Sequence, residues 1–145
     1  MATYLKIKNY KTCLPAGRLK ILLVMSLRRL LKSFTDAFRG LKHVFKSEQN
    51  FRIQVLLGFL VFAAAAYFPL RSWEVILLIL LVLLVLLVEI LNTAFENFSD
   101  LLKPRLHHYV GVVKDIMAGA VLLTSLVAVI VGAIIFYPHL ANLIK

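Results

Sequence analysis

Residues 75–88 read VILLILLVLLVLLV, an unbroken run of fourteen apolar residues, and residues 89–100 continue with EILNTAFENFSD. This run approaches the ~20 apolar residues that a helix needs to cross a bilayer. Two further apolar stretches flank it, one on each side along the chain. The sequence therefore predicts an all-α membrane protein with three transmembrane helices, at about 53–70, 73–98 and 116–137.

The composition excludes an ordinary soluble domain. Hydrophobic residues make up 61% of the 145 residues and charged residues 17%, against roughly 45–50% and 25% in soluble proteins. A chain this short has a large surface for its volume and cannot bury so much apolar material by itself. The single cysteine, Cys13, excludes an intramolecular disulfide, and no Cys/His cluster shows zinc-binding spacing.

The net charge of +10 lies entirely in the N-terminal third. Residues 1–52 carry twelve basic and two acidic residues, whereas the rest of the chain carries five of each. Because this basic arm adjoins segments of membrane length, we expect an anionic membrane surface as its partner and no nucleic acid. The N-terminal arm and the polar connection 100–115 hold fifteen of the seventeen basic residues. Basic loops stay in the cytoplasm, which predicts a multi-pass protein of the bacterial inner (cytoplasmic) membrane with a cytoplasmic N-terminus.

An amphipathic surface helix is predicted at about 27–46, within an interfacial segment that begins near Leu14. Large apolar residues recur there at helical spacing, and basic residues fill much of the remainder, which is typical of a helix lying on a membrane. The apolar set is Leu27, Leu30, Leu31, Phe34, Phe38, Leu41 and Phe45; the basic set is Arg28, Arg29, Lys32, Arg39, Lys42 and Lys46. Residues 1–26 form a basic N-terminal extension, to which the sequence assigns no role.

The segment after the long apolar run carries a stripe of polar side chains. At about 100° per residue, Asn92, Glu96 and Asp100 fall within about 60° of Glu89 around the helix. An ionised carboxylate facing lipid costs at least ~2.5–3.5 kcal/mol. The stripe must therefore face protein, water or a cation, and a hard divalent ion such as Mg2+ prefers carboxylate oxygens. Hydrogen bonding between helices is the alternative for the same stripe.

Two other charged positions lie at membrane boundaries. Glu48 precedes the first span, and its spacing from Arg52 predicts an i,i+4 ion pair as the alternative to a metal-binding role. Lys114 precedes the third span, where its ammonium group would either extend to the interface or hold a phosphate.

Three motifs together resemble the prokaryotic integral-membrane diacylglycerol kinase family, which includes undecaprenol kinases. They are EILNTAFENFSD at 89–100, GVVKDIMAGA at 111–120, and the pair RGL at 39–41 and EQNFR at 48–52. The resemblance covers about residues 27–140. Gln54 departs from the pattern, since relatives often carry an acid or a histidine at that position.

The resemblance implies an ATP- and Mg2+-dependent lipid kinase that phosphorylates the hydroxyl of diacylglycerol or undecaprenol. It implies a kinase domain at 27–145, and a homotrimer whose subunits share active sites. It implies that Glu89 is the general base and that Glu48 and Glu96 hold Mg2+. The implied ATP-binding residues are Arg29, Glu48, Glu96, His107, Lys114 and Asp115, and those that contact or support the lipid substrate are Arg52, Asn92, Asp100 and Ala118.

Two other functional classes compete with a kinase. A small membrane transporter would use Glu89 as its ionisable site, but transporters are typically built from internal repeats, and these three spans are unlike one another. A non-catalytic membrane assembly subunit would explain the basic arm. It would not explain three carboxylates on one helical stripe.

The charge distribution generates a topology prediction. Reporter fusions should place the N-terminus and residue 105 in the cytoplasm and residue 145 outside, because basic loops are retained on the cytoplasmic side. Finding residues 105 and 145 on the same side of the membrane would contradict three spans.

Overall fold

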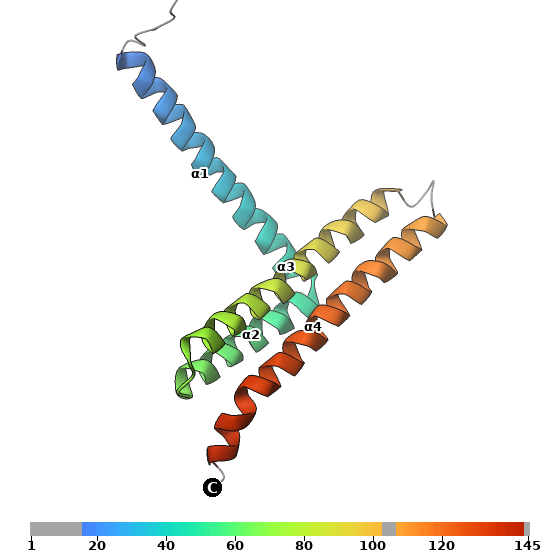
Figure 1. Cartoon of the computed structure of the whole chain (residues 1–145). Coiled ribbons are helices and arrows are strands. Elements are labelled where there is room, and N and C mark those ends of the chain that lie inside the picture. The colour runs from blue at the N-terminus through green and yellow to red at the C-terminus, as the bar shows by residue number, and fades with distance from the viewer. Residues whose placement is uncertain (1–15, 103–106, 144–145) are drawn as a thin grey trace, which may run out of the picture. The chain divides into compact units, whose positions relative to one another are not determined.

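The computed structural model describes the backbone of residues 16–102 and 107–143, and the side chains of residues 27–101 and 109–141. Nearly all of these residues are helical (Figure 1). The helices are α1 (Ala16–Ser47), α2 (Gln49–Tyr67), α3 (Ser72–Leu102) and α4 (His107–Leu143). The chain divides into two units, residues 1–40 and 41–145, and the boundary falls inside α1. The predicted all-α class is confirmed.

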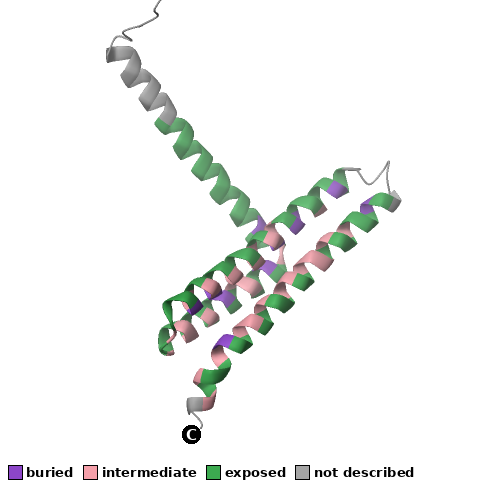
Figure 2. Cartoon of the chain, in the orientation of Figure 1, coloured by how far each residue is buried: buried purple, intermediate pink, exposed green. Residues whose placement is uncertain are grey.

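Three of the helices are long and apolar enough to cross a membrane. The candidate spans are Gln49–Tyr67, Ser72–Leu101 and Tyr109–Ala141. Few of their side chains are buried within the chain, as Figure 2 shows by the scarcity of purple positions. So much exposed apolar surface needs hydrocarbon or further protein around it, which agrees with the three spans predicted from the sequence.

Within the unit 41–145, α3 packs against both α2 and α4 (Figure 1). Leu78 of α3 and Ile135 of α4 are among its few buried apolar residues. α2 lies close to α3 at Gly58, where a Cβ atom would lie 2.9 Å from Cγ1 of Val82. A residue without a side chain lets the two backbones approach, as is common between membrane helices.

A hydrogen-bonded turn joins α2 to α3. The amide of Phe68 donates to the carbonyl of Ala64 (3.0 Å), and Pro69 then excludes further helix. Glu74, in the first turn of α3, accepts a hydrogen bond from the backbone N–H of Arg71 (2.7 Å). This side chain satisfies one of the free amides at the helix start. The same carboxylate lies 3.7 Å from Nε2 of His139, near the end of α4.

Two predicted boundaries were wrong. The expected polar connection 100–115 is mostly helical, because α3 continues to Leu102 and α4 begins at His107. Pro104 is the only strong helix breaker in that stretch, and residues 107–115 extend the helical pattern of the third span. The third span was also expected to end at Pro138, but α4 continues to Leu143. Only one backbone hydrogen bond is lost at a proline, and membrane helices tolerate that loss.

Helix α1 is longer than the predicted 27–46. It begins at Ala16 and so includes much of the expected interfacial segment. All the large apolar residues predicted for its membrane-facing side are exposed within the chain, with exposed fractions between 44% for Leu41 and 69% for Phe38. Residues 1–15 of the predicted extension lie outside the described residues.

The contact at Gly58 generates a stability prediction. Gly58→Ala should lower the free energy of unfolding by roughly 1–3 kcal/mol, the usual effect of overpacking, because the new methyl collides with Val82. Thermal unfolding in detergent micelles measures the change. The double variant Gly58→Ala/Val82→Ala removes the collision. Its loss in free energy of unfolding should therefore be smaller than the sum of the losses of the two single variants. A loss greater than that sum would argue against a steric cause.

Candidate active site

Part of the polar stripe predicted on the second span is buried along one face of α3, together with two further polar residues. Glu89 is 1% exposed, Thr93 2%, Ser99 3% and Asn92 8%. Glu89 is the largest fully buried side chain of the described residues. The helical repeat of 3.6 residues places these positions on one side. Of the predicted stripe, Glu89 and Asn92 face protein, whereas Glu96 is half-buried and Asp100 is exposed.

Glu89 is held from a second helix. Nε2 of Gln54, in α2, donates a hydrogen bond to Oε2 of Glu89 (3.3 Å). The hydroxyl of Thr93 donates to the Glu89 backbone carbonyl one turn back (3.1 Å). These two contacts fix the side chain and the backbone of Glu89.

The remaining polar groups extend the cluster on both sides of Glu89. Glu48 and Glu96 lie close enough that their negative charges act on the Glu89 carboxylate. Nδ2 of Asn92 donates to Oε1 of Glu96 (3.0 Å). The buried amide oxygens of Gln54 and Asn92 find no hydrogen-bond donor among the described residues. The site therefore brings together three carboxylates from two segments and two open acceptors.

A second group of charges lies nearer the C-terminal end of α3. Nζ of Lys114, in α4, binds Oδ1 of Asp100 at 2.8 Å. This pair is solvent-accessible, with side-chain exposures of 31% for Lys114 and 54% for Asp100. Asp115 and Ala118, on the same helix, are exposed.

The ion pair between Glu48 and Arg52, which was the alternative to a metal-binding role, does not form. Nη1 of Arg52 instead donates to the carbonyls of Lys46 (3.0 Å) and Phe45 (3.4 Å). The i,i+4 rule applies within one helix, but the helix is interrupted at Glu48, which is extended (φ −99°, ψ 119°). Arg29 lies exposed in the unit 1–40, which the structure describes separately from the site. The side chain of His107, which was predicted to bind ATP, lies outside the described residues.

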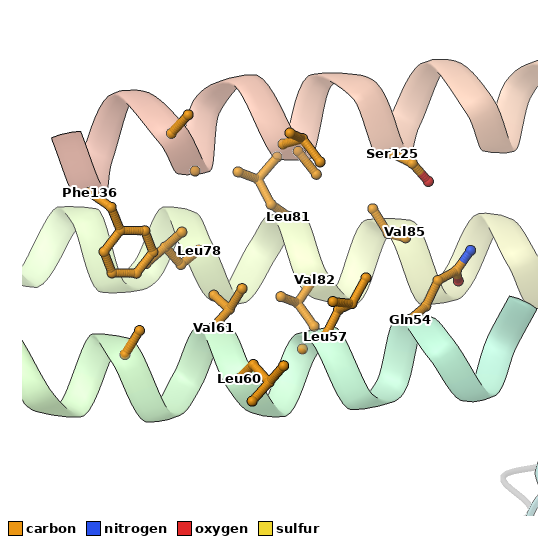
Figure 3. A pocket seen from close by; sticks show the side chains of 16 residues that line it. Gln54, Leu57, Leu60, Val61, Leu78, Leu81, Val82, Val85, Ser125 and Phe136 are labelled. Carbon is orange, nitrogen blue, oxygen red and sulfur yellow. The ribbon is translucent and has the colours of Figure 1, made fainter.

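An apolar pocket of about 420 Å3 lies between α2, α3 and α4. Figure 3 shows Gln54 towards one end of its lining and Phe136 towards the other. Leu, Val, Ala and Gly side chains form most of the wall, and Ser125 is the other polar residue. The amide that holds Glu89 thus also faces an apolar space beside it.

The residues present fit a magnesium ion whose coordination is completed by substrate phosphates and water. No group of three His, Cys, Asp or Glu side chains that could hold a metal occurs within the described residues. Mg2+ is usually held by only one or two carboxylates together with substrate phosphates and water. Glu48 and Glu96 supply that number of carboxylates, and carboxylate oxygens are the ligands this ion prefers.

Sequence reasoning missed the contact that holds Glu89. Gln54 was noted only as a departure from a pattern, and Thr93 and Ser99 were not assigned to the site. A polar residue within an apolar span is the available signal for Gln54, because an amide facing lipid would be costly. The sequence gives no signal that Gln54 binds Glu89, which is 35 residues away.

The fold and site define an all-helical membrane protein whose buried acid is held between two helices. Comparison with known proteins gives the particular family. The family profile described as prokaryotic diacylglycerol kinase matches residues 35–136. The chain belongs to this family, whose enzymes are lipid kinases, and the resemblance drawn from the three motifs is confirmed.

Three curated relatives carry two names. A diacylglycerol kinase of Synechocystis sp. is 40% identical over 115 residues, which cover 79% of this chain and 66% of the relative. An undecaprenol kinase of Bacillus subtilis is 32% identical, with 79% of this chain and 93% of the relative covered. A diacylglycerol kinase of Haemophilus influenzae is 31% identical, with 77% and 95% covered.

Proposed function

We propose that this chain is an ATP- and Mg2+-dependent kinase that phosphorylates the hydroxyl of a membrane lipid alcohol. Its lipid is diacylglycerol, giving phosphatidic acid, or undecaprenol, giving undecaprenyl phosphate, the substrates that the relatives' names indicate. The observation that carries the proposal is the Glu89 carboxylate, fully buried beside the apolar run and held by Gln54. A base at that depth meets a hydroxyl that stays with its lipid in the membrane.

In the proposed reaction, Glu89 is the general base. Its carboxylate takes the proton of the lipid hydroxyl as the oxygen bonds to the γ-phosphorus of ATP, and the bond from that phosphorus to the β-phosphate oxygen breaks to release ADP. Phosphoryl transfer needs mainly positioning and neutralisation of charge. The hydrogen bond from Gln54 to Oε2 holds the carboxylate in position for this transfer.

Glu48 and Glu96 are proposed to hold Mg2+. The bound ion supplies neutralisation of the phosphate charges. The hydrogen bond from Asn92 orients the Glu96 carboxylate towards that role, and metal ligands usually depend on such supporting contacts.

Lys114, Asp115, Arg29 and His107 are proposed to contact ATP. Lys114 must leave Asp100 to reach a phosphate, and exposed ion pairs are worth only about 0–1 kcal/mol. Breaking the 2.8 Å ion pair to free the ammonium group for a phosphate would therefore cost little free energy. Arg52, Asp100 and Ala118 are proposed as supporting residues around the lipid and nucleotide.

Helix α1 is proposed to lie on the cytoplasmic surface of the bacterial inner membrane. From Leu27 to Phe45 its exposed apolar residues fall on one side, and its basic residues would meet anionic headgroups. The kinase domain would then comprise 27–145, preceded by the basic extension 1–26.

Three such chains are proposed to form a homotrimer with shared sites. A single chain leaves most of the surface of its spans exposed, and Glu96 and Asp100 are not enclosed by it. Charged groups cannot face lipid cheaply. Among the residues that the structure describes, no neighbouring helix lies within 4 Å of where a Cβ atom of Gly119 would be. The small residues Ala118, Gly119 and Ala120 therefore leave room there for another chain.

The activity is tested by transfer of labelled γ-phosphate from ATP to diacylglycerol and undecaprenol, side by side, in detergent–lipid micelles. Glu89→Gln keeps the size of the side chain and removes the base, so turnover should fall by about 10²–10⁴-fold. Arg71→Gln, at the opposite end of α3, serves as the control and should keep its rate. Transfer to neither lipid would refute the proposed activity. Normal turnover by Glu89→Gln would show that Glu89 is not the general base.

Shared sites predict recovery of activity on mixing. At limiting Mg2+, Glu48→Gln chains should have little activity through weaker use of the ion, and Glu89→Gln chains should have little activity through loss of the base. If the two carboxylates of one site come from different subunits, trimers assembled from both variants contain some intact sites and regain part of the activity. Mixed oligomers that are shown to form and yet stay inactive would mean that each chain builds its own site.

A further inference from the structure

The junction between α1 and α2 consists of one residue. α1 ends at Ser47 and α2 begins at Gln49, so Glu48 alone carries the change of direction. Its backbone N–H donates to the carbonyl of Val44 (2.9 Å). Asp, Asn, Ser and Thr at such helix starts commonly accept a hydrogen bond from the following turn, but the longer Glu48 side chain makes no such bond. Its carboxylate is left available to a ligand outside its own helix.

Arg52 ties the two helices together across this junction. Its guanidinium donates to the carbonyls of Lys46 and Phe45, which are in the last turn of α1. The last four carbonyls of a helix lack partners within the helix, and a positive charge there is favourable. The rings of Phe45 and Phe51 meet edge to face at 6.4 Å, with Phe51 buried. Arg52 therefore spans the bend from one turn inside α2.

The same geometry keeps Arg52 away from the carboxylate it was expected to pair with. An arginine bound to Glu48 would neutralise it and compete with a divalent cation for its oxygens. Because the guanidinium bonds to carbonyl groups instead, it does not occupy the Glu48 carboxylate, while the Glu48 backbone is fixed from both sides.

We propose that Arg52 is the positioning residue for Glu48: it clamps the last turn of α1 to the first turn of α2 and so directs the Glu48 carboxylate to the metal. This inference rests on the proposed role of Glu48 in holding Mg2+. Residues that orient metal ligands typically change metal affinity by 10–100-fold when they are lost. Removing the clamp should therefore raise the Mg2+ requirement by roughly that factor and change kcat at saturating Mg2+ much less.

The kinetic test uses Arg52→Gln, Arg52→Lys and the control Arg71→Gln, assayed for phosphate transfer over a range of Mg2+ concentrations. Arg52→Gln should need about 10–100-fold more Mg2+ for half-maximal rate, Arg52→Lys should lie between it and the parent, and Arg71→Gln should match the parent. In the Glu48→Gln background, Arg52→Gln should add little, since the ligand that it positions is already gone. A full additional loss there would overturn the positioning role.

A structural test is independent of activity. Spin labels at Lys42 and Leu56, two exposed positions on either side of the junction, report the angle between the helix ends through their distance distribution, with Cys13→Ser as background. Arg52→Gln should broaden this distribution, whereas Arg71→Gln should not. An unchanged distribution overturns the clamp even if the kinetics change. If Glu48→Gln leaves the Mg2+ requirement unaltered while the distribution broadens as expected, the metal role of Glu48 fails and the clamp at the junction stands.

Discussion

A carboxylate cannot be left facing hydrocarbon, and the packing of this chain follows from that constraint on Glu89. The side chain comes directly after fourteen apolar residues and is fully buried. Its donor, Gln54, is one turn before Gly58 in α2, and Val82 is two turns before Glu89 in α3. The pairs Gln54–Glu89 and Gly58–Val82 therefore belong to one antiparallel contact. The absent side chain at Gly58 brings the backbones close enough for the amide to reach the acid.

The two ends of α3 treat negative charge differently. Glu74 lies in the first turn, where free amides and the helix dipole favour an acid, and it accepts the Arg71 N–H there. Asp100 lies in the last turn, where the dipole opposes an acid, and α3 has no basic residue in that turn. One cation that offsets it is Lys114 of α4. The acidic end of α3 is thus stabilised in part by positive charge from another helix.

Local periodicity carried the sequence predictions that succeeded. The three spans follow from the length of apolar runs, and the buried stripe from Glu89 to Asn92 follows from the helical repeat. The contacts that the sequence did not predict depend on where a helix is interrupted and on which helices pack together. The ion pair considered as an alternative for Glu48 and Arg52 assumed that both residues lie in one helix, and no glycine or proline marks the interruption at Glu48. The Gln54–Glu89 contact joins residues of different helices, and periodicity within each helix does not fix how the two align.

The apolar pocket between α2, α3 and α4 has a different energetic meaning in a bilayer from the one it would have in water-soluble proteins. An apolar void of this size inside a soluble core is a loss of dispersion contacts that nothing refills, and stability falls with its volume. Around a membrane helix the solvent itself consists of hydrocarbon chains, which can enter a space of about 420 Å3 lined by Leu57, Val61 and Phe136. The chains of the surrounding lipid then act as part of the core. The order and length of those chains become contributors to the stability of the fold, as temperature and salt are for a soluble enzyme.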